Sequence, residues 1–223
     1  MMAAMGGDKF FLGGREKRKS VDNLKKAAAC VFQFRHGLQP ENLVLSSDRY
    51  QEFRMAVKTI EQISHLYHFT DRRNLDSIKS LGGLFPYSIL VERGINIPAP
   101  GGNEWSHDAD AMNGVDGDIH LCFRNNHPME HVARQEGRLG DTIFLRINAS
   151  VLQWTGVRFT SDVANKADVV ATPIADAESI IDFEVLYTRT DWNDPQISAR
   201  LQNAEKYEVL VPHVIPLDMI GNI

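Results

Sequence analysis

The sequence predicts an α+β domain built around a small, mostly antiparallel sheet. Short strand-like segments are interleaved with short helical ones, without the regular alternation or the glycine fingerprint of a doubly wound nucleotide-binding fold. The chain has 223 residues, 43% of them hydrophobic, which is enough to bury a full core and leave some extra length. We therefore expect one globular domain preceded by an extension.

The extension is expected in two parts. Residues 1–20 contain four glycines and a basic cluster, and they have little to pack, which predicts a mobile arm. Residues 21–63 are predicted to be helical, because apolar residues recur at helical spacing over Ser20–Phe34 and again from Asp48 to about Ile63. Residues 64–223 then form the domain.

The charges of these regions differ in sign. Up to Ser64 the chain carries 11 Lys and Arg against 7 acids, whereas the rest of the chain carries 13 basic and 22 acidic residues. A basic arm on an acidic body favours a polyanionic partner, since phosphate binding is driven by Lys and Arg. A solvated helix face beside a disordered tail explains the same charges.

Alternating and apolar segments predict the strands of the domain: His65–Thr70, Asp118–Phe123, Thr142–Ile147, Val157–Thr160, Phe183–Tyr187 and Tyr207–Val211. Helical spacing and capping residues predict helices from Thr70 or Asp71 to Gly82, and over Tyr87–Glu92, Pro128–Glu136, about Ile174–Ile181 and the end of Trp192–Asn203. Pro and Gly punctuation predicts a long irregular loop that continues through Gly117. Loops of this length inside a compact domain are often functional.

Several classes of protein are excluded. No run approaches the roughly 18 apolar residues of a membrane span, and the N-terminus lacks the continuous apolar region of an export signal, so a cytoplasmic protein is expected. Cys30 and Cys122 are too few for a disulfide framework or a thiolate metal cage. No Gly-x-Ser-x-Gly elbow marks a serine hydrolase.

Glu208 is the first candidate for chemistry, because it lies within an apolar strand where an unpaired carboxylate is costly. The alternative is a solvent-facing position on an edge strand, and Glu205 is its exposed rival. His68 and Thr70, followed by Asn74, are the second candidate, because they offer donors and acceptors at a strand end next to a helix N-terminus. Thr70 as a simple N-cap and His68 as a structural histidine remain the plainer interpretation.

A metal site has less support. The candidate ligands are scattered around a loop rich in Gly and Pro and lack the fixed spacing of a rigid site: His107, Asp108, Asp110, His120 and His127. We expect no metal.

Four segments in order resemble the DarT family of toxins, which ADP-ribosylate DNA bases. They are Leu66–Thr70 with Asn74, Leu75 and Ile78; His120–Phe123 with His127–Met129; Val157–Thr160 with Asn165; and Glu208–Pro212. The resemblance spans roughly Ser64 to Pro216. It implies an ADP-ribosyltransferase-like split sheet with NAD+ as co-substrate in its cleft.

By this resemblance the last-motif glutamate, Glu208, is catalytic. It would stabilise the positive charge that develops on the ribose as the nicotinamide bond breaks, and it could also accept a proton from the attacking base. His68, Phe69, Thr70 and Asn74 would lie against the nicotinamide half of NAD+. Met129 and Asn165 would line the nucleic-acid side.

One departure from the family pattern concerns an arginine that helps to organise the site in many members. The matching segment here contains only Arg93, and Ser106 or His107 could replace it. The acceptor base, thymine or guanine, therefore stays open.

The acceptor base is expected on single-stranded DNA or a flipped nucleotide, since a paired base cannot present its edge. Arg124, Arg134, Arg138 or the basic arm would contact phosphates, and Trp105, Trp154 and Trp192 are candidates for base stacking. The resemblance also implies a toxin with a macrodomain antitoxin as partner. The alternatives are transfer to RNA or protein, or a binding module without catalysis.

Overall fold

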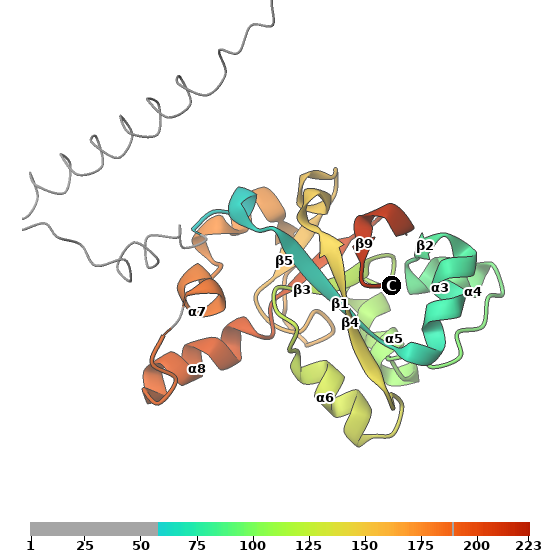
Figure 1. Cartoon of the computed structure of the whole chain (residues 1–223), viewed down its shortest axis with the longest axis horizontal. Coiled ribbons are helices and arrows are strands. Elements are labelled where there is room, and N and C mark those ends of the chain that lie inside the picture. The colour runs from blue at the N-terminus through green and yellow to red at the C-terminus, as the bar shows by residue number, and fades with distance from the viewer. Residues whose placement is uncertain (1–57, 189) are drawn as a thin grey trace, which may run out of the picture. The chain divides into compact units, whose positions relative to one another are not determined.

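A computed structural model describes residues 58–188 and 190–223 (Figure 1). The predicted basic arm, residues 1–20, and most of the predicted helical extension, 21–63, lie outside the described residues. Within its last residues, Ile60–Gln62 form a short 3-10 turn, η2, and Ile63 is extended. The predicted helix is therefore not observed in its described residues, 58–63, and the side chain of Ile63 is buried in the core of the domain.

Seven strands form one sheet in the order β6-β5-β7-β3-β1-β4-β9, and every pairing in it is antiparallel. Their bounds are β1 His65–Asp71, β3 Ile119–Cys122, β4 Thr142–Asn148, β5 Arg158–Thr160, β6 Thr172–Pro173, β7 Glu208–Val211 and β9 Ile220–Gly221. A separate two-stranded sheet pairs β2 (Gly83–Leu84) with β8 (Ile215–Pro216). The expected antiparallel architecture is confirmed.

The large sheet is divided between β1 and β3. Strands β1 and β4 pair along all seven residues of β1, whereas β1 and β3 share the single register pair Tyr67 and Cys122. One half therefore consists of β1, β4 and β9, and the other consists of β3, β7, β5 and β6. This division is the split that the sequence led us to expect.

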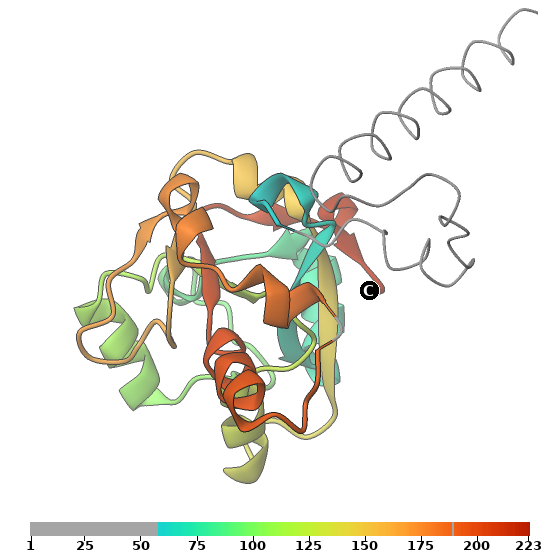
Figure 2. The ribbon, with the colours of Figure 1, turned by 90° about the vertical axis from the view of Figure 1, so that its left-hand side faces the viewer.

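Short helices cover both sides of the strands. Helices α3 (Leu75–Leu81) and α4 (Tyr87–Glu92) lie on one side and α7 (Phe183–Tyr187) and α8 (Pro195–Ala204) on the other (Figure 1). Viewed from the second side, α7 and α8 lie in front of the strands (Figure 2). The remaining helices are α5 (Glu104–Met112), α6 (Pro128–Gln135), and the 3-10 turns η3 (Arg72–Asn74), η4 (Ala149–Gln153), η5 (Ile174–Ser179) and η6 (Leu217–Met219).

Capping residues explain where the first strand ends and the first helix begins and stops. Asp71 closes β1 and accepts hydrogen bonds from the backbone N–H groups of Arg73, at 2.9 Å, and Gly140, at 2.7 Å. The first bond satisfies a donor at the start of the following helical turn, and the second ties this turn to the segment before β4. Gly82 ends α3 with a φ of +83°, a left-handed conformation that glycine adopts without strain.

Two predicted elements are wrong. The long loop that was expected through Gly117 contains α5, which escapes detection by periodicity because its large apolar residues, Trp105 and Met112, face solvent. Phe183–Tyr187 is helix α7 and not a strand. Asp182 accepts a hydrogen bond from the N–H of Val185 and caps this helix, and a short apolar run is compatible with either structure.

The predicted helix over about Ile174–Ile181 is the 3-10 turn η5.

The core of the domain consists of large apolar side chains of the strands, each at most 1% exposed: Leu66, Leu121, Leu145, Ile147, Phe159 and Val209. No helix in the described part of the chain is long and apolar enough to cross a membrane.

Candidate active site

A cavity of about 260 Å³ opens where the two halves of the sheet diverge. Its apolar lining comes largely from α3, β2 and α4, including Ile78, Leu81, Leu84, Phe85 and Leu90. Its polar lining comes from β1, α5, β3 and β7, and includes His68, Thr70, Asn74, Asp110, His120 and Glu208. A cavity with an apolar wall and a few convergent polar groups is typical of a small-molecule site.

Glu208 opens β7 and is 5% exposed. The register places it opposite Cys122 of β3 and Thr160 of β5, between two paired strands. Because alternate residues of a strand share a face, His120 lies on the same face as Cys122 and thus beside Glu208. The solvent-facing edge position that we considered for Glu208 is ruled out.

The carboxylate of Glu208 accepts its hydrogen bonds on one oxygen, and a histidine lies beside the other. Nδ1 of His120 donates a hydrogen bond to Oε2 over 2.9 Å, and the backbone N–H of Ala164 donates to the same oxygen over 3.3 Å. Nε2 of the buried His127 lies 3.4 Å from Oε1. Several groups thus hold the carboxylate in one orientation.

The protonation states follow from these contacts. Burial opposes charge on both members of the pair, but the hydrogen bond and the charge of Glu208 raise the pKa of His120 to about 9. In return, the hydrogen bond and the positive charge of His120 outweigh burial and lower the pKa of Glu208. Near neutral pH the pair is therefore a carboxylate with an imidazolium.

The β1 side of the cavity is organised by Asn74. Its amide donates to the carbonyl of Ala99 over 2.7 Å and to Thr70 Oγ1 over 3.0 Å, and its carbonyl accepts from the Ala99 N–H over 2.9 Å. All three residues are buried. Asn74 therefore fastens the segment that follows α4 to the end of β1, and both Thr70 and Ala99 line the cavity.

Aromatic rings stack along the same wall. His68 donates from Nδ1 to the carbonyl of His120 over 3.0 Å, and burial lowers its pKa, so its neutral ring keeps Nε2 as an acceptor. Phe69 stacks on His127 with ring centroids 5.7 Å apart. His107 stacks on Tyr87 at 3.7 Å.

The structure brings together seven of the ten residues predicted for the site. These seven line the cavity: His68, Phe69, Thr70, Asn74, Met129, Asn165 and Glu208. The three arginines do not line it. Arg93 lies 5.3 Å from the ring centre of Phe85, Arg124 lies 5.7 Å from that of Trp192, and Arg134 is an exposed residue near Glu130.

Both residues considered as replacements for the family arginine line the cavity. Ser106 is buried and donates from its hydroxyl to Asn103, whereas His107 is half-buried. Within residues 58–188 and 190–223, no three His, Cys, Asp or Glu side chains converge to hold a metal ion. Of the candidate ligands, His120 and His127 instead contact Glu208.

Sequence reasoning missed the roles of His120, His127 and Asp110 as partners in the Glu208 environment. The alternation of Asp118–Phe123 places His120 on one face of a strand, but only the register of β3 against β7 places that face beside Glu208. No sequence signal specifies this register. Asp110 lies on the helix that the sequence did not predict.

Comparison with known proteins identifies the family. The family model described as "ssDNA thymidine ADP-ribosyltransferase, DarT" matches residues 67–223, which is most of the chain. The chain belongs to the DarT family. As a DarT, it is an NAD+-dependent ADP-ribosyltransferase that modifies DNA.

Solved DarT structures share its fold. Thermus sp. 2.9 DarT in complex with ADP-ribosylated ssDNA is 18% identical, with a TM-score of 0.52 and coverage of 71% of this chain and 79% of that one. The same Thermus protein in complex with NAD+ is 18% identical, with a TM-score of 0.51, and the match covers 72% of this chain and 80% of that one. Thermosipho africanus DarTG in complex with ADP-ribose is 14% identical, with a TM-score of 0.53, and the match covers 71% of this chain and 43% of that one. No curated protein matches the chain by sequence.

Proposed function

We propose that this DarT transfers ADP-ribose from NAD+ to a thymidine base of single-stranded DNA and that Glu208 is its catalytic carboxylate. The observation that carries the proposal is the placement of Glu208: it is buried at the cavity, ionised, and held through Oε2 by hydrogen bonds from His120 and the backbone of Ala164, with His127 beside Oε1. The family description supports thymidine as the acceptor.

The chemistry explains why a held, ionised carboxylate is useful. Positive charge develops on the ribose as its bond to nicotinamide breaks, and a fixed negative charge nearby interacts more strongly with that transition state than with the ground state. Nicotinamide leaves as a neutral molecule, so no second carboxyl group is required as a strong acid. Because His120 keeps the pKa of Glu208 low, this carboxylate remains charged near neutral pH.

The residues around the cavity fit NAD+ on the β1 side. Neutral His68, the Thr70 hydroxyl and the segment held by Asn74 would bind the nicotinamide and its ribose, and Phe69 would flank them. The apolar wall from α3, β2 and α4 suits an aromatic base. Arg93 contacts Phe85 on this wall, and its own contact with NAD+ stays a prediction.

Met129 and Asn165 line the cavity and would face the acceptor nucleotide. Arg124 and Arg134 lie outside the cavity, where they would contact DNA phosphates. The acidic body leaves few cations for this purpose, so DNA binding should weaken steeply as salt rises.

We also propose that the enzyme acts as a toxin whose partner is a macrodomain antitoxin that removes the modification. Support for this partner comes from family membership and from the Thermosipho match, in which the DarT fold is part of a longer chain named DarTG. The proposal predicts that co-expression of such a macrodomain relieves toxicity in cells.

The test is the intact mass of four short single-stranded oligonucleotides after incubation with the protein and NAD+. Each oligonucleotide contains one type of base at its centre in an otherwise constant context that lacks thymine and guanine. A gain of one ADP-ribose on the thymine oligonucleotide alone is expected. Modification of the guanine oligonucleotide would show that guanine is the acceptor base. Consumption of NAD+ with unmodified DNA would show that the acceptor is RNA or protein.

A further inference from the structure

We propose that Asp110 is a second catalytic carboxylate, which takes the proton that the acceptor base loses when its nitrogen attacks the ribose. This inference rests on the proposed function. Asp110 lies in α5 and lines the same cavity as Glu208. Its Oδ1 atom is buried and has no hydrogen-bond partner within the described part of the chain. A buried carboxylate oxygen without a partner is costly, and a catalytic role is one of the reasons for which proteins retain such a group.

The two carboxylates of the cavity differ in what they are able to accept. Glu208 already receives hydrogen bonds from His120 and from the backbone of Ala164 on one oxygen, and His127 faces the other. Asp110 keeps a vacant acceptor at the cavity wall. An incoming N–H group therefore finds on Asp110 a buried acceptor that receives no hydrogen bond, whereas Glu208 already receives two hydrogen bonds on Oε2.

The charges around the cavity shift the pKa values of Asp110 and Glu208 in opposite directions. Burial raises the pKa of Asp110 to about 6, with His120 opposing the shift and the negative charges of Glu208 and Asp116 adding to it. The pKa of Glu208 is instead lowered. Two carboxyl groups whose environments move their pKa values apart are typical of a base and an electrostatic stabiliser.

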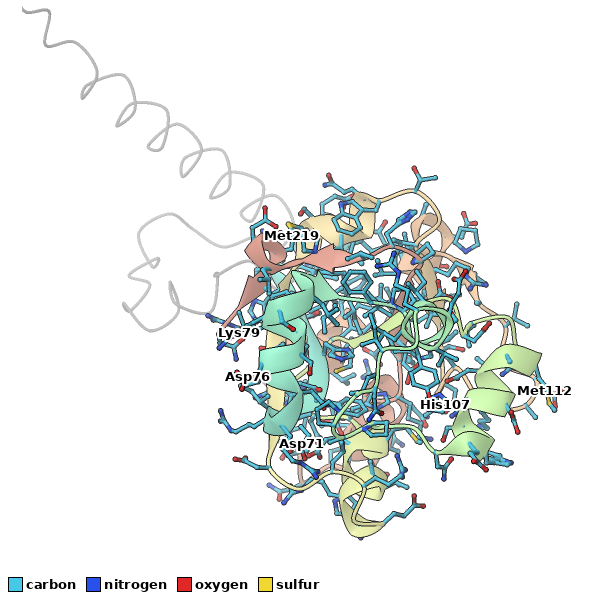
Figure 3. The ribbon with its side chains drawn as sticks, turned by 90° about the vertical axis from the view of Figure 1, so that its right-hand side faces the viewer. Asp71, Asp76, Lys79, His107, Met112 and Met219 are labelled. Atoms are coloured by element: carbon cyan, nitrogen blue, oxygen red, sulfur yellow. The ribbon has the colours of Figure 1, made fainter. Side chains whose placement is uncertain are left out.

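The groups that surround Asp110 come from several elements. His120 from β3, Glu208 from β7 and Asp116 after α5 act on its charge. The other titratable groups that line the same cavity are His107 of the same helix, Asp118 and His68 of β1. The ion pair of Lys166 and Asp162 lies on the segment that Asn113 fastens to the end of α5. Figure 3 shows how this helix is oriented, with Met112 pointing into solvent and His107 directed toward the body of the molecule.

The proposed step is balanced. The base nitrogen forms a bond to C1′ of the ribose, and the bond between C1′ and the nicotinamide nitrogen breaks with its electron pair remaining on nicotinamide. The proton of the attacking imide nitrogen passes to the Asp110 carboxylate and later to water. No oxidant, reductant or further reactant is needed.

The test compares Asp110→Asn with Asp108→Asn, which makes the same change at an exposed position of the same helix. Asp110→Asn should lower the rate of transfer to the modified oligonucleotide by about 10²- to 10⁴-fold, the usual contribution of a general base. Its affinity for NAD+, measured by calorimetry, should stay within about threefold of the wild type. Asp108→Asn should leave both quantities unchanged.

A pH profile separates a base from a merely structural group. The wild-type single-turnover rate should rise through pH about 6 and then level off. The rate of Asp110→Asn should keep rising above that pH, because hydroxide then takes over the proton. If Asp110→Asn keeps both the wild-type rate and the wild-type pH profile, the inference is overturned. If this variant fails to fold, a wild-type rate that does not change between pH 5 and 7 would overturn it as well.

The two proposals fail in different ways. If the wild-type protein transfers ADP-ribose to none of the oligonucleotides, the proposed function is wrong. If the wild type transfers and Asp110→Asn transfers equally well, only the role of Asp110 is wrong.

Discussion

Two walls of the cavity hold their charged groups differently: a strand wall formed by β3 and β7, and a helix wall formed by α5. On the strand wall, the buried Glu208 of β7 and the partly buried His120 of β3 form a pair whose positions are specified by an antiparallel register. On the helix wall, Asp110 has a buried oxygen without a partner in the described structure, and the same helix exposes Trp105 and Met112. The carboxylate of the strand wall receives hydrogen bonds from the protein, whereas the helix wall leaves a carboxylate oxygen unpaired and exposes two large apolar side chains.

This difference indicates that the two walls bind different parts of the reacting complex. Pre-organised charge is most useful where charge develops during a reaction, because no reorganisation is then needed. Vacant acceptors and exposed rings are useful where a substrate has to enter. The strand wall therefore suits the ribose of NAD+, and the helix wall suits the incoming nucleotide.

The largest effect is expected from Glu208→Gln, which removes the charge of the strand wall and nearly preserves its shape. Transfer of ADP-ribose to DNA should fall by about 10³-fold or more, since the developing charge on the ribose loses its stabiliser. The affinity for NAD+ should change little. Glu92→Gln, at an exposed position of α4, is the matched control, and a Glu208→Gln enzyme with more than a tenth of the wild-type rate would exclude Glu208 from catalysis.

The pairing of His120 with Glu208 predicts a pH dependence of folding stability. A histidine whose pKa is raised from 6.5 to about 9 stabilises the fold fully below pH 6.5, and this contribution is lost as the pH rises through about 9. It corresponds to at most about 3 kcal/mol. Urea unfolding between pH 6.5 and 9.5 measures it.

His120→Gln is the control for this dependence. Burial lowers the pKa of His68 and of His127, so both histidines are neutral in the folded state and largely neutral in the unfolded state above about pH 7.5, and they contribute little to the decline from there to pH 9.5. The unfolding free energy of the variant should therefore decline much less over this range. An equal decline in both proteins would show that His120 is not the group responsible.

Asn74→Ala should detach the segment at Ala99 from the end of β1. The variant loses three buried hydrogen bonds, so we expect a loss of about 2 kcal/mol in unfolding free energy and about a tenfold rise in KM for NAD+. Asn74→Asp keeps an acceptor for the Ala99 N–H and should be affected less in KM. An unchanged KM in Asn74→Ala would separate this segment from NAD+ binding.

The smallest effect is expected at Trp192, which is 43% exposed and lies under the Arg124 guanidinium. If bases stack there, Trp192→Ala should weaken binding of single-stranded DNA by about 1 kcal/mol, or about fivefold. Fluorescence anisotropy with a labelled oligonucleotide measures this change. Trp105→Ala tests α5 in the same assay, and a larger loss there than in Trp192→Ala would place the stacked bases at α5.

Local sequence determined the elements that have a strong pattern of their own. His65–Thr70, Tyr87–Glu92, Thr142–Ile147 and the helix that opens at Pro128 were predicted within about one residue, because alternation, helical spacing and capping act over short distances. The elements that failed have weak patterns. Helix α5 exposes its large apolar residues, and α7 is a five-residue apolar run.

The order of motifs along the chain was sufficient to indicate the DarT family and to single out Glu208, His68 and Asn74. Only the tertiary structure decided what surrounds them. The pairing of β3 with β7 brings His120 to Glu208 across 88 positions of sequence, and α5 brings Asp110 to the same cavity. The physical reason is that strand register and helix placement depend on packing of the whole core, whereas an isolated motif specifies only its own backbone and its own charges.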